Sequence, residues 1–386
     1  MFKLSHNIIR KYNFSNFTKP YIYLYDTTLR DGLQNADINA DLDCKKKYIE
    51  VIKKYNFDYN EIAMIGDVHY NELSNMKYKN TIMLSLPTQQ YVDMAITNKI
   101  TKLQFVIKTD EEQIHTVINK KSSEYIDECI KMIILLKKHN IEPICAFEHF
   151  FDEYKKNKSF ALHIIKQLYL AGSKWIVLAD TNGGTLPTEI EKILEEVSIV
   201  IPLNHIGIHA HNDMDLAVAN SITAVMKGVR MVQGTWNGMG ERCGNANLLS
   251  VFLTLHIKLN YSSCLDNKMT QLTTSSKTIN SIFGCRTIES CLPYVGTNAF
   301  AHKAGLHIHA VNKKPKFYEH IDPTIVGNIR NIILSDSIGR SVLTNILGEK
   351  PDLQFLPIAK KIIHTTDSNN VKEKIINAYK LYKKII

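Results

Sequence analysis

The sequence predicts an α/β protein built on a (β/α)8 TIM barrel, followed by a small, mainly helical C-terminal region. Eight short apolar runs alternate with stretches whose apolar residues recur every three or four positions. Chemically reactive side chains gather where several of these runs end, which is where barrel enzymes carry their catalytic groups. A chain of 386 residues with 45% hydrophobic content is long enough for one such barrel and an appendage.

The eight apolar runs are predicted to be the barrel strands, in chain order. They are residues 21–25, 59–66, 81–87, 102–108, 142–149, 174–181, 205–211 and 231–238. Helical periodicity is clearest in residues 44–55, 123–139, 159–171, 188–200 and 216–227. The alternation continues to about residue 260, so we predict a catalytic barrel over residues 21–260.

The remainder, residues 261–386, is predicted to form a linker and helical subdomains. The strand–helix rhythm stops there, and helical patterns cover residues 273–291, 341–347 and 356–386. A polar connection at residues 313–322 separates the first of these patterns from the others. We therefore expect this part to pack as helices beside a barrel rather than to extend the barrel itself.

Composition excludes several classes of protein. The formal net charge is +9, but the lysines are scattered and form no basic stripe with interleaved aromatics, so no nucleic-acid partner is expected. Charged residues interrupt every apolar run well before the roughly 18 residues of a membrane span, so no membrane partner is expected either. Seven cysteines without Cys-x-x-Cys spacing argue against a disulfide framework and indicate a reducing compartment.

Residues 1–20 are predicted to be an N-terminal extension. They contain four basic residues and no acidic one, and they lack the continuous apolar core of a secretory signal. Such a segment is either a short leading tail or an organellar transit peptide. We expect a cytoplasmic protein, with organellar targeting by residues 1–20 as the alternative.

A metal site is predicted from His209, His211 and Asp31. The two histidines stand two positions apart at the end of a strand, so their side chains face the same side. Asp31, 178 residues earlier, follows the first strand. Imidazole nitrogens and a carboxylate suit one divalent cation with room for a 2-oxo acid. The alternatives are a loop cap for the aspartate, buried structural histidines, and the rival pair His307 and His309 outside the barrel.

Two neighbours of these residues have chemistry of their own. Arg30, next to Asp31, is suited to stabilising an oxyanion, and its alternative is a structural ion pair. The segment Gly238-Met-Gly-Glu-Arg-Cys-Gly-Asn245 contains three glycines that allow close approach to a ligand. In it, Asn245 offers an amide oxygen as a hard metal ligand, and Glu241 and Arg242 can orient neighbouring residues. Neither nucleotide-phosphate motif is present.

These motifs resemble the acyl-CoA-condensing branch of the metal-dependent TIM-barrel lyase superfamily. The resemblance rests on Asp26-Thr-Thr-Leu-Arg-Asp-Gly32 with Gln34, on His209-Ala-His-Asn-Asp213, and on residues 232–245. The branch contains 2-isopropylmalate, homocitrate and citramalate synthases. Residues 147–154, 179–187 and 299–307 with 318–323 are most similar to citramalate synthases, and the whole resemblance covers residues 21–345.

The resemblance implies condensation of acetyl-CoA, as co-substrate, with pyruvate on the pathway to isoleucine. It implies that Asp31, His209, His211 and Asn245 hold one divalent metal ion. It also implies that the 2-oxo acid is bound by Arg30, Gln34 and Thr181, with Arg30 polarising its carbonyl.

The proton abstraction is implied to involve residues beyond the barrel. His307 and Tyr318 match the family's catalytic positions there, and Glu148 matches an acidic residue near acetyl-CoA. Histidine is a suitable base near neutral pH, although His307 could instead be structural. The family exchanges this region between subunits, so we expect a homodimer whose other partners are small-molecule substrates.

Two departures from the family pattern affect these expectations. Residues 61–67 replace a glycine- and tryptophan-rich strand ending, which leaves 2-isopropylmalate or homocitrate synthase activity as an alternative to pyruvate condensation. Relatives continue into a C-terminal allosteric domain that we do not expect here, so inhibition by isoleucine or leucine is not expected. A C–C lyase of the same superfamily and a non-catalytic subunit are the remaining alternatives.

Overall fold

The computed structural model describes residues 19–76, 78–285, 289–335, 338–366 and 370–385. It divides into two compact units, Met1–Asn267 with Ile282–Gly284 and Lys268–Ser281 with Cys285–Ile386. Of the predicted N-terminal extension, residues 1–18 lie outside the described residues. No helix among the described residues has both the length and the hydrophobicity that a bilayer crossing requires.

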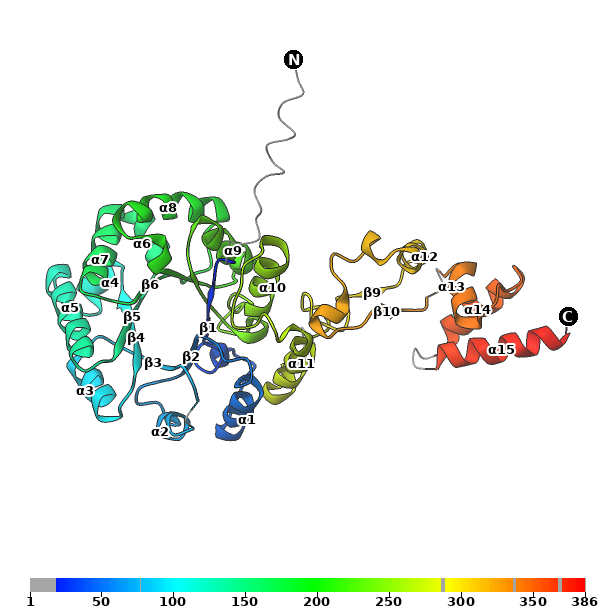
Figure 1. The fold of residues 1–386 in the computed structure, drawn as a ribbon, viewed down its shortest axis with the longest axis horizontal. Helices are drawn as coiled ribbons and strands as arrows, with labels where there is room; N and C mark the ends of the chain where they lie inside the picture. The colour runs from blue at the N-terminus through cyan, green and yellow to red at the C-terminus, as the bar shows by residue number, and fades with distance from the viewer. Residues whose placement is uncertain (1–18, 77, 286–288, 336–337, 367–369, 386) are drawn as a thin grey trace, which may run out of the picture. The chain divides into compact units, whose positions relative to one another are not determined.

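Eight parallel strands close into a barrel in the first unit, which confirms the predicted fold class. Each strand pairs with the next along the chain, and β1 pairs with β8 to close the ring, with Tyr23 opposite Met231 and Asp26 opposite Gly234. Figure 1 shows the strands at the centre of the unit. They are β1 (Tyr23–Asp26), β2 (Tyr59–Met64), β3 (Thr81–Ser85), β4 (Lys102–Lys108), β5 (Glu142–Glu148), β6 (Trp175–Asp180), β7 (Ile206–Ala210) and β8 (Met231–Gly234).

Helices connect the strands and surround the ring (Figure 1). Local capping fixes where several of them begin: the side chain of Asp110 accepts from the backbone N–H of Gln113 at 2.9 Å, and that of Asn157 accepts from Phe160 at 3.2 Å. The helices are α1 (Leu42–Ile52), α2 (Tyr70–Ser74), α3 (Gln89–Thr97), α4 (Glu111–Thr116), α5 (Ser122–Lys138), α6 (Phe150–Lys156), α7 (Lys158–Leu170), α8 (Pro187–Val200), α9 (Ala217–Lys227) and α10 (Leu248–Leu259).

A packed layer of aromatic and aliphatic side chains fills the barrel interior. Tyr25 stacks on Tyr59 with ring centroids 5.7 Å apart, and Trp175 Nε1 donates to the Tyr59 hydroxyl at 2.8 Å. Ile144 and Val177 belong to the same layer, and all five residues are buried. Most of them lie in the first halves of their strands. Side chains therefore fill the amino-terminal part of the barrel interior, and space for a site is left at the carboxyl ends of the strands.

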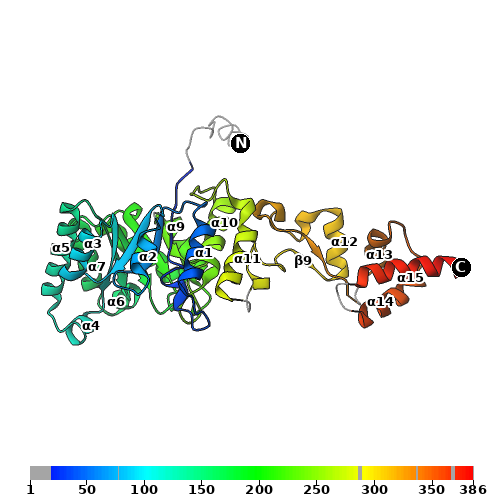
Figure 2. The ribbon, with the colours of Figure 1, turned by 90° about the horizontal axis from the view of Figure 1, so that it is seen from below.

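The second unit is mainly helical, as predicted, but it also contains two short strands that the sequence did not predict. Strands β9 (Ala301–His302) and β10 (Asn331–Ile332) pair in parallel. The helices α13, α14 and α15 lie together at the red end of the chain in Figure 2 and share a core that includes Val342, Phe355 and Ile375. The helices of this part are α11 (Leu272–Phe283), α12 (Gly305–Lys313), α13 (Arg340–Leu347), α14 (Phe355–Thr365) and α15 (Val371–Ile385).

Candidate metal centre and cavity

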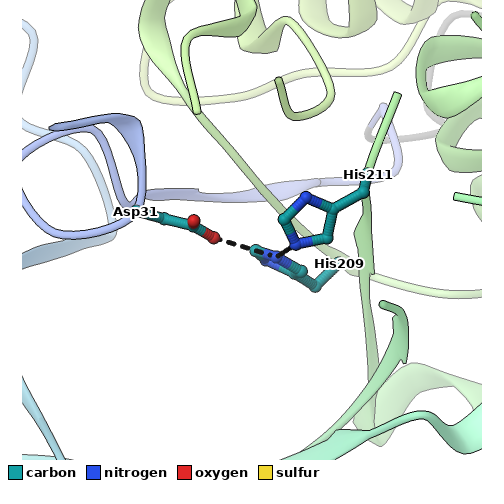
Figure 3. A group of neighbouring side chains, drawn as sticks. All are labelled: Asp31, His209 and His211. Atoms are coloured by element: carbon teal, nitrogen blue, oxygen red, sulfur yellow. Dashed lines mark hydrogen bonds and ion pairs between the residues drawn. The ribbon is translucent and has the colours of Figure 1, made fainter. Parts of the chain in front are cut away.

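Asp31, His209 and His211 converge at the carboxyl ends of β1 and β7. Figure 3 shows the carboxylate of Asp31 pointing at the two imidazoles. His209 Nε2 lies 3.1 Å from Asp31 Oδ2 and 3.4 Å from His211 Nε2. All three residues are buried, and they form the one group of His, Cys, Asp and Glu side chains in the described part of the chain whose ligand atoms could hold a metal ion.

The electrostatics of this group match the protonation states that a metal ion requires. Burial raises the pKa of Asp31, but Arg30 and the hydrogen bond from His209 outweigh it and hold that pKa well below its usual value. Burial and the neighbouring His209 lower the pKa of His211 to about 4. Near neutral pH the group therefore offers an ionised carboxylate and a neutral imidazole, which are the ligand forms.

Asn245 lies beside His211, with which it forms an isolated antiparallel β-bridge. Its Nδ2 donates to the carbonyl of Met239 at 3.1 Å, while its Oδ1 is buried and has no hydrogen-bond partner among the described residues. A Cβ at Gly240, where φ is +153°, would lie 2.1 Å from Asn245 Nδ2. The glycine there is what allows the loop to pass so close to the asparagine.

Arg30 is held by Glu61, a residue that the sequence analysis did not assign to the site. The Arg30 guanidinium pairs through Nε with the Glu61 carboxylate, and its Nη1 lies 3.5 Å from Asp31 Oδ2. Both of these acidic groups raise the pKa of Arg30 against the effect of its burial, so the cation is fixed. The other donors to Glu61 are the Tyr25 hydroxyl at 2.5 Å, the Thr27 hydroxyl at 2.9 Å and Gln104 Nε2 at 2.8 Å.

The ion pair that the sequence left as an alternative for Arg30 is therefore present, and the same side chain also lines the cavity. The sequence signal for Glu61 was a carboxylate inside a predicted barrel strand, where an unpaired buried charge would be costly. Gln104 is likewise a polar residue in the interior of a strand, β4. Gln233 Nε2 donates to Gln104 Oε1 at 2.6 Å. These polar residues point inward and extend the site across the barrel.

A cavity of about 320 Å³ opens over these residues at the carboxyl ends of the strands. Seven of the residues predicted to form the site line it, and four apolar side chains form another part of its wall. The predicted residues are Arg30, Asp31, Gln34, Glu148, Thr181, His209 and His211; the apolar ones are Leu84, Val106, Ala146 and Ala179; the others are Gln104, Gln233, Glu241 and Arg242.

Two of the predicted residues are fixed by partners from neighbouring strands. Glu148, at the end of β5, forms an ion pair with Lys108 at the end of β4. Thr181 follows β6, and its Oγ1 accepts a hydrogen bond from the backbone N–H of His149 at 2.7 Å. Each of these side chains is therefore held by a partner at an adjacent strand end.

His307 and Tyr318 belong to the second unit, where the structure brings them together. Their rings stack with centroids 4.1 Å apart and an interplanar angle of 27°. Both side chains are exposed, Tyr318 to 47%. His309 is on the same helix, α12, but residues two apart on a helix point in different directions, so His307 and His309 do not form the rival metal pair.

Comparison with known proteins agrees with this architecture. The HMGL-like family matches residues 21–279, and a homocitrate synthase post-HMGL domain-like family matches residues 294–353. An (R)-citramalate synthase of Aquifex aeolicus is 36% identical over 85% of this chain and 65% of its own length. The (R)-citramalate synthase of Geobacter sulfurreducens is 34% identical over 91% of this chain and 69% of its own length.

Among solved structures, the HMG-CoA lyase of Bacillus subtilis aligns with a TM-score of 0.61 and 21% identity, covering 69% of this chain and 96% of the lyase. At that identity the likeness concerns the fold alone. The chain belongs to the HMGL-like family of barrel proteins, in the part of it that carries the post-HMGL domain of homocitrate synthases. It spans about two thirds of the length of the citramalate synthases that it matches.

Proposed function

We propose that this protein is an acyltransferase that condenses acetyl-CoA with pyruvate and water to give citramalate and CoA. The observation that carries the proposal is the cavity at the barrel mouth, which combines a buried Asp-His-His cluster, the fixed cation of Arg30 and four apolar side chains. The resemblance to citramalate synthases of other organisms supports the choice of substrates.

One divalent metal ion fits the residues at the centre of this cavity. Asp31, His209 and His211 would supply the ligand atoms already gathered there, and the buried Oδ1 of Asn245, which has no hydrogen-bond partner in the described part of the chain, would supply a fourth. When bound, the ion would act as a Lewis acid toward the carbonyl and carboxylate oxygens of the 2-oxo acid. The ligand set of nitrogen and oxygen atoms suits Zn²⁺, Mn²⁺, Co²⁺ or Mg²⁺, and the identity of the ion is left open.

We assign the two ends of the 2-oxo acid to the polar and the apolar residues that line the cavity. Arg30, pinned by Glu61 beside the metal ligands, is placed to stabilise negative charge that develops on the ketone oxygen. Thr181 and Gln34 line the same cavity and are assigned to substrate binding. Leu84, Val106, Ala146 and Ala179 would receive the methyl group, and a cavity near the lower end of the roughly 300–1,000 Å³ range of ligand sites favours a small substrate.

The acetyl methyl group must lose a proton before it can attack the ketone. We assign this step to His307, with Tyr318 stacked against it and Glu148 near the acetyl-CoA. The resulting enolate forms the new C–C bond, the ketone oxygen takes up a proton, and hydrolysis of the thioester releases CoA. We further propose that the segment carrying His307 and Tyr318 serves the barrel of the partner subunit in a homodimer.

Release of free thiol from acetyl-CoA tests the function directly, with pyruvate, 2-oxoisovalerate and 2-oxoglutarate offered in turn to the metal-loaded protein. We expect thiol release with pyruvate and a kcat/KM for the other two acids at least tenfold lower. A higher kcat/KM for 2-oxoisovalerate or 2-oxoglutarate would instead show a 2-isopropylmalate or homocitrate synthase. Thiol release with none of them, together with cleavage of a 3-hydroxyacyl-CoA, would show a lyase.

A further inference from the structure

Thr181 is held at two points by neighbouring loops. Its Oγ1 accepts from the His149 N–H at 2.7 Å, and its backbone carbonyl accepts from Arg242 Nη2 at 2.7 Å. A hydroxyl can accept two hydrogen bonds and donate one. Among the hydrogen bonds of the described residues, Thr181 Oγ1 serves only as an acceptor, so its O–H is left for the cavity that Thr181 lines.

His149 reaches Thr181 because its backbone is left-handed, with φ 59° and ψ 25°. This conformation is uncommon for a residue with a side chain and tends to be kept where a site requires it. His149 lies between the end of β5 and the start of α6, and its backbone N–H points toward Thr181 at the end of β6. The loop after β6 is tied to the same helix, since Asn182 Nδ2 donates to Asp152 Oδ2 at 2.9 Å.

Arg242 reaches Thr181 from the other side. Its Nε and Nη2 donate to the two carboxylate oxygens of Asp213 at 2.7 and 3.1 Å, and Nη2 also donates to Thr181. Arg242 is itself left-handed, with φ 56°. A Cβ at Gly183 would lie 2.6 Å from Asp213 Oδ2, so the glycine allows Asp213 to approach this loop. One guanidinium thus joins the loops that follow β6, β7 and β8.

We propose that Arg242 is a positioning residue for substrate recognition. Together with Asp213 and the His149 N–H it fixes Thr181 so that the hydroxyl donates to the carboxylate of the 2-oxo acid. The nature of the substrate rests on the proposed function. The contacts of Arg242 and the His149 N–H with Thr181, together with the Arg242–Asp213 pair, form a clamp that is a property of the free protein. If the Arg242–Asp213 pair had no such role, it would add little to the stability of the fold, because exposed ion pairs contribute weakly.

A double-mutant cycle of Arg242→Gln and Thr181→Ala tests this role. We expect Arg242→Gln to raise the KM for pyruvate about tenfold or more, with kcat changed less than threefold and the KM for acetyl-CoA unchanged. In the Thr181→Ala background the same substitution should change the KM by less than about twofold, because the hydroxyl it positions is gone. Lys227→Gln is the control, since Lys227 pairs with Glu191 and Glu195 between barrel helices.

Equal effects of Arg242→Gln in both backgrounds would overturn the proposal. If Arg242→Gln does not fold, Arg242→Lys, which keeps one charged donor, should show a smaller rise in KM that is again lost in the Thr181→Ala background. Backbone hydrogen exchange at residues 181–184 without substrate should be faster in Arg242→Gln than in wild type, and unchanged exchange would exclude the clamp. If wild type fails with pyruvate, the proposed substrate is wrong, and this exchange measurement still decides whether the clamp exists.

Discussion

The metal cluster in the barrel and the His307–Tyr318 pair in the second unit are built in opposite ways. Asp31, His209 and His211 are buried, their ligand atoms are in contact, and the pKa values of Asp31 and His211 are displaced in the directions that suit metal binding. His307 and Tyr318 are exposed and are held against each other by ring stacking. The proposed metal site thus lies within one compact unit, while the proposed proton transfer depends on residues of the other. Substitutions should separate the two functions.

The largest effect is expected for His211→Ala. Removal of one imidazole leaves an incomplete ligand set, so metal affinity should fall more than about 100-fold, because loss of even an outer partner of a ligand costs roughly 10- to 100-fold. Thiol release should be abolished. Metal content after gel filtration and the thiol assay measure both effects. The control is His205→Ala, which directly precedes β7 at the end opposite to His211. A variant that keeps a full equivalent of metal would refute the ligand assignment.

His307→Ala should differ from His211→Ala in losing catalysis while retaining metal binding. General acid–base catalysis contributes roughly 10²- to 10⁴-fold, so kcat should fall by about that factor while metal content stays at the wild-type level. His309→Ala, on the same helix, should retain wild-type activity. Equal activity of the two variants, or metal loss in His307→Ala, would show that His307 has been given the wrong role.

Mixing two inactive variants asks whether the two regions cooperate across subunits. If the His307 segment serves the partner's barrel, one of the two sites in a His211→Ala/His307→Ala heterodimer is intact. Random exchange makes half of the dimers mixed, so about one quarter of the wild-type activity should return. Subunit exchange is verified by mass spectrometry of differently tagged chains. Absence of recovery after exchange would place His307 with its own barrel or outside catalysis.

The smallest effect concerns stability and a second buried carboxylate of the barrel. Burial raises the pKa of Asp26 to about 6, although hydrogen bonds from Thr28 and Tyr48 oppose the shift. Between the usual pKa of 3.8 and this raised pKa, the native state therefore keeps a proton that the unfolded chain releases. As the pH rises from 3.8 to 6, the free energy of unfolding should fall by up to about 3 kcal/mol. Asp26→Asn should remove that part of the pH slope in urea titrations, and an unchanged slope would contradict the raised pKa.

The barrel could be predicted from the sequence because each strand is specified locally. Residues 102–108 match β4 at both ends, and the other predicted strands overlap the observed ones. The helix predicted over residues 273–291 instead ends at Phe283, where Gly284 adopts φ +74° and stops it. The two-residue strands β9 and β10 are too short to produce a periodic pattern, and their pairing is decided by partners about 30 residues away.

The candidate site was predictable where chemistry and strand position coincide, as for Asp31, His209 and His211. Glu61 was not, because its importance depends on the approach of Arg30 from the loop after β1, and a single carboxylate within a strand does not show what it faces. Arg242 was predicted to orient its neighbours, but not which ones, because its contacts with Thr181 and Asp213 join three loops that are distant in sequence. Local pattern identifies the ends of strands, whereas contacts between the loops require the closed ring.

The closure of that ring by β1 and β8 has a consequence for biosynthesis. The first strand has its partner more than 200 residues later, and the backbone N–H of Tyr23 donates to the carbonyl of Arg230 across this seam. During translation β1 has only one of its two neighbours until β8 leaves the ribosome, which takes tens of seconds at the slower rates of about 5 residues per second. Because Asp31 and His209 stand on opposite sides of the seam, we expect the proposed set of metal ligands to be complete only after the last strand has joined the ring.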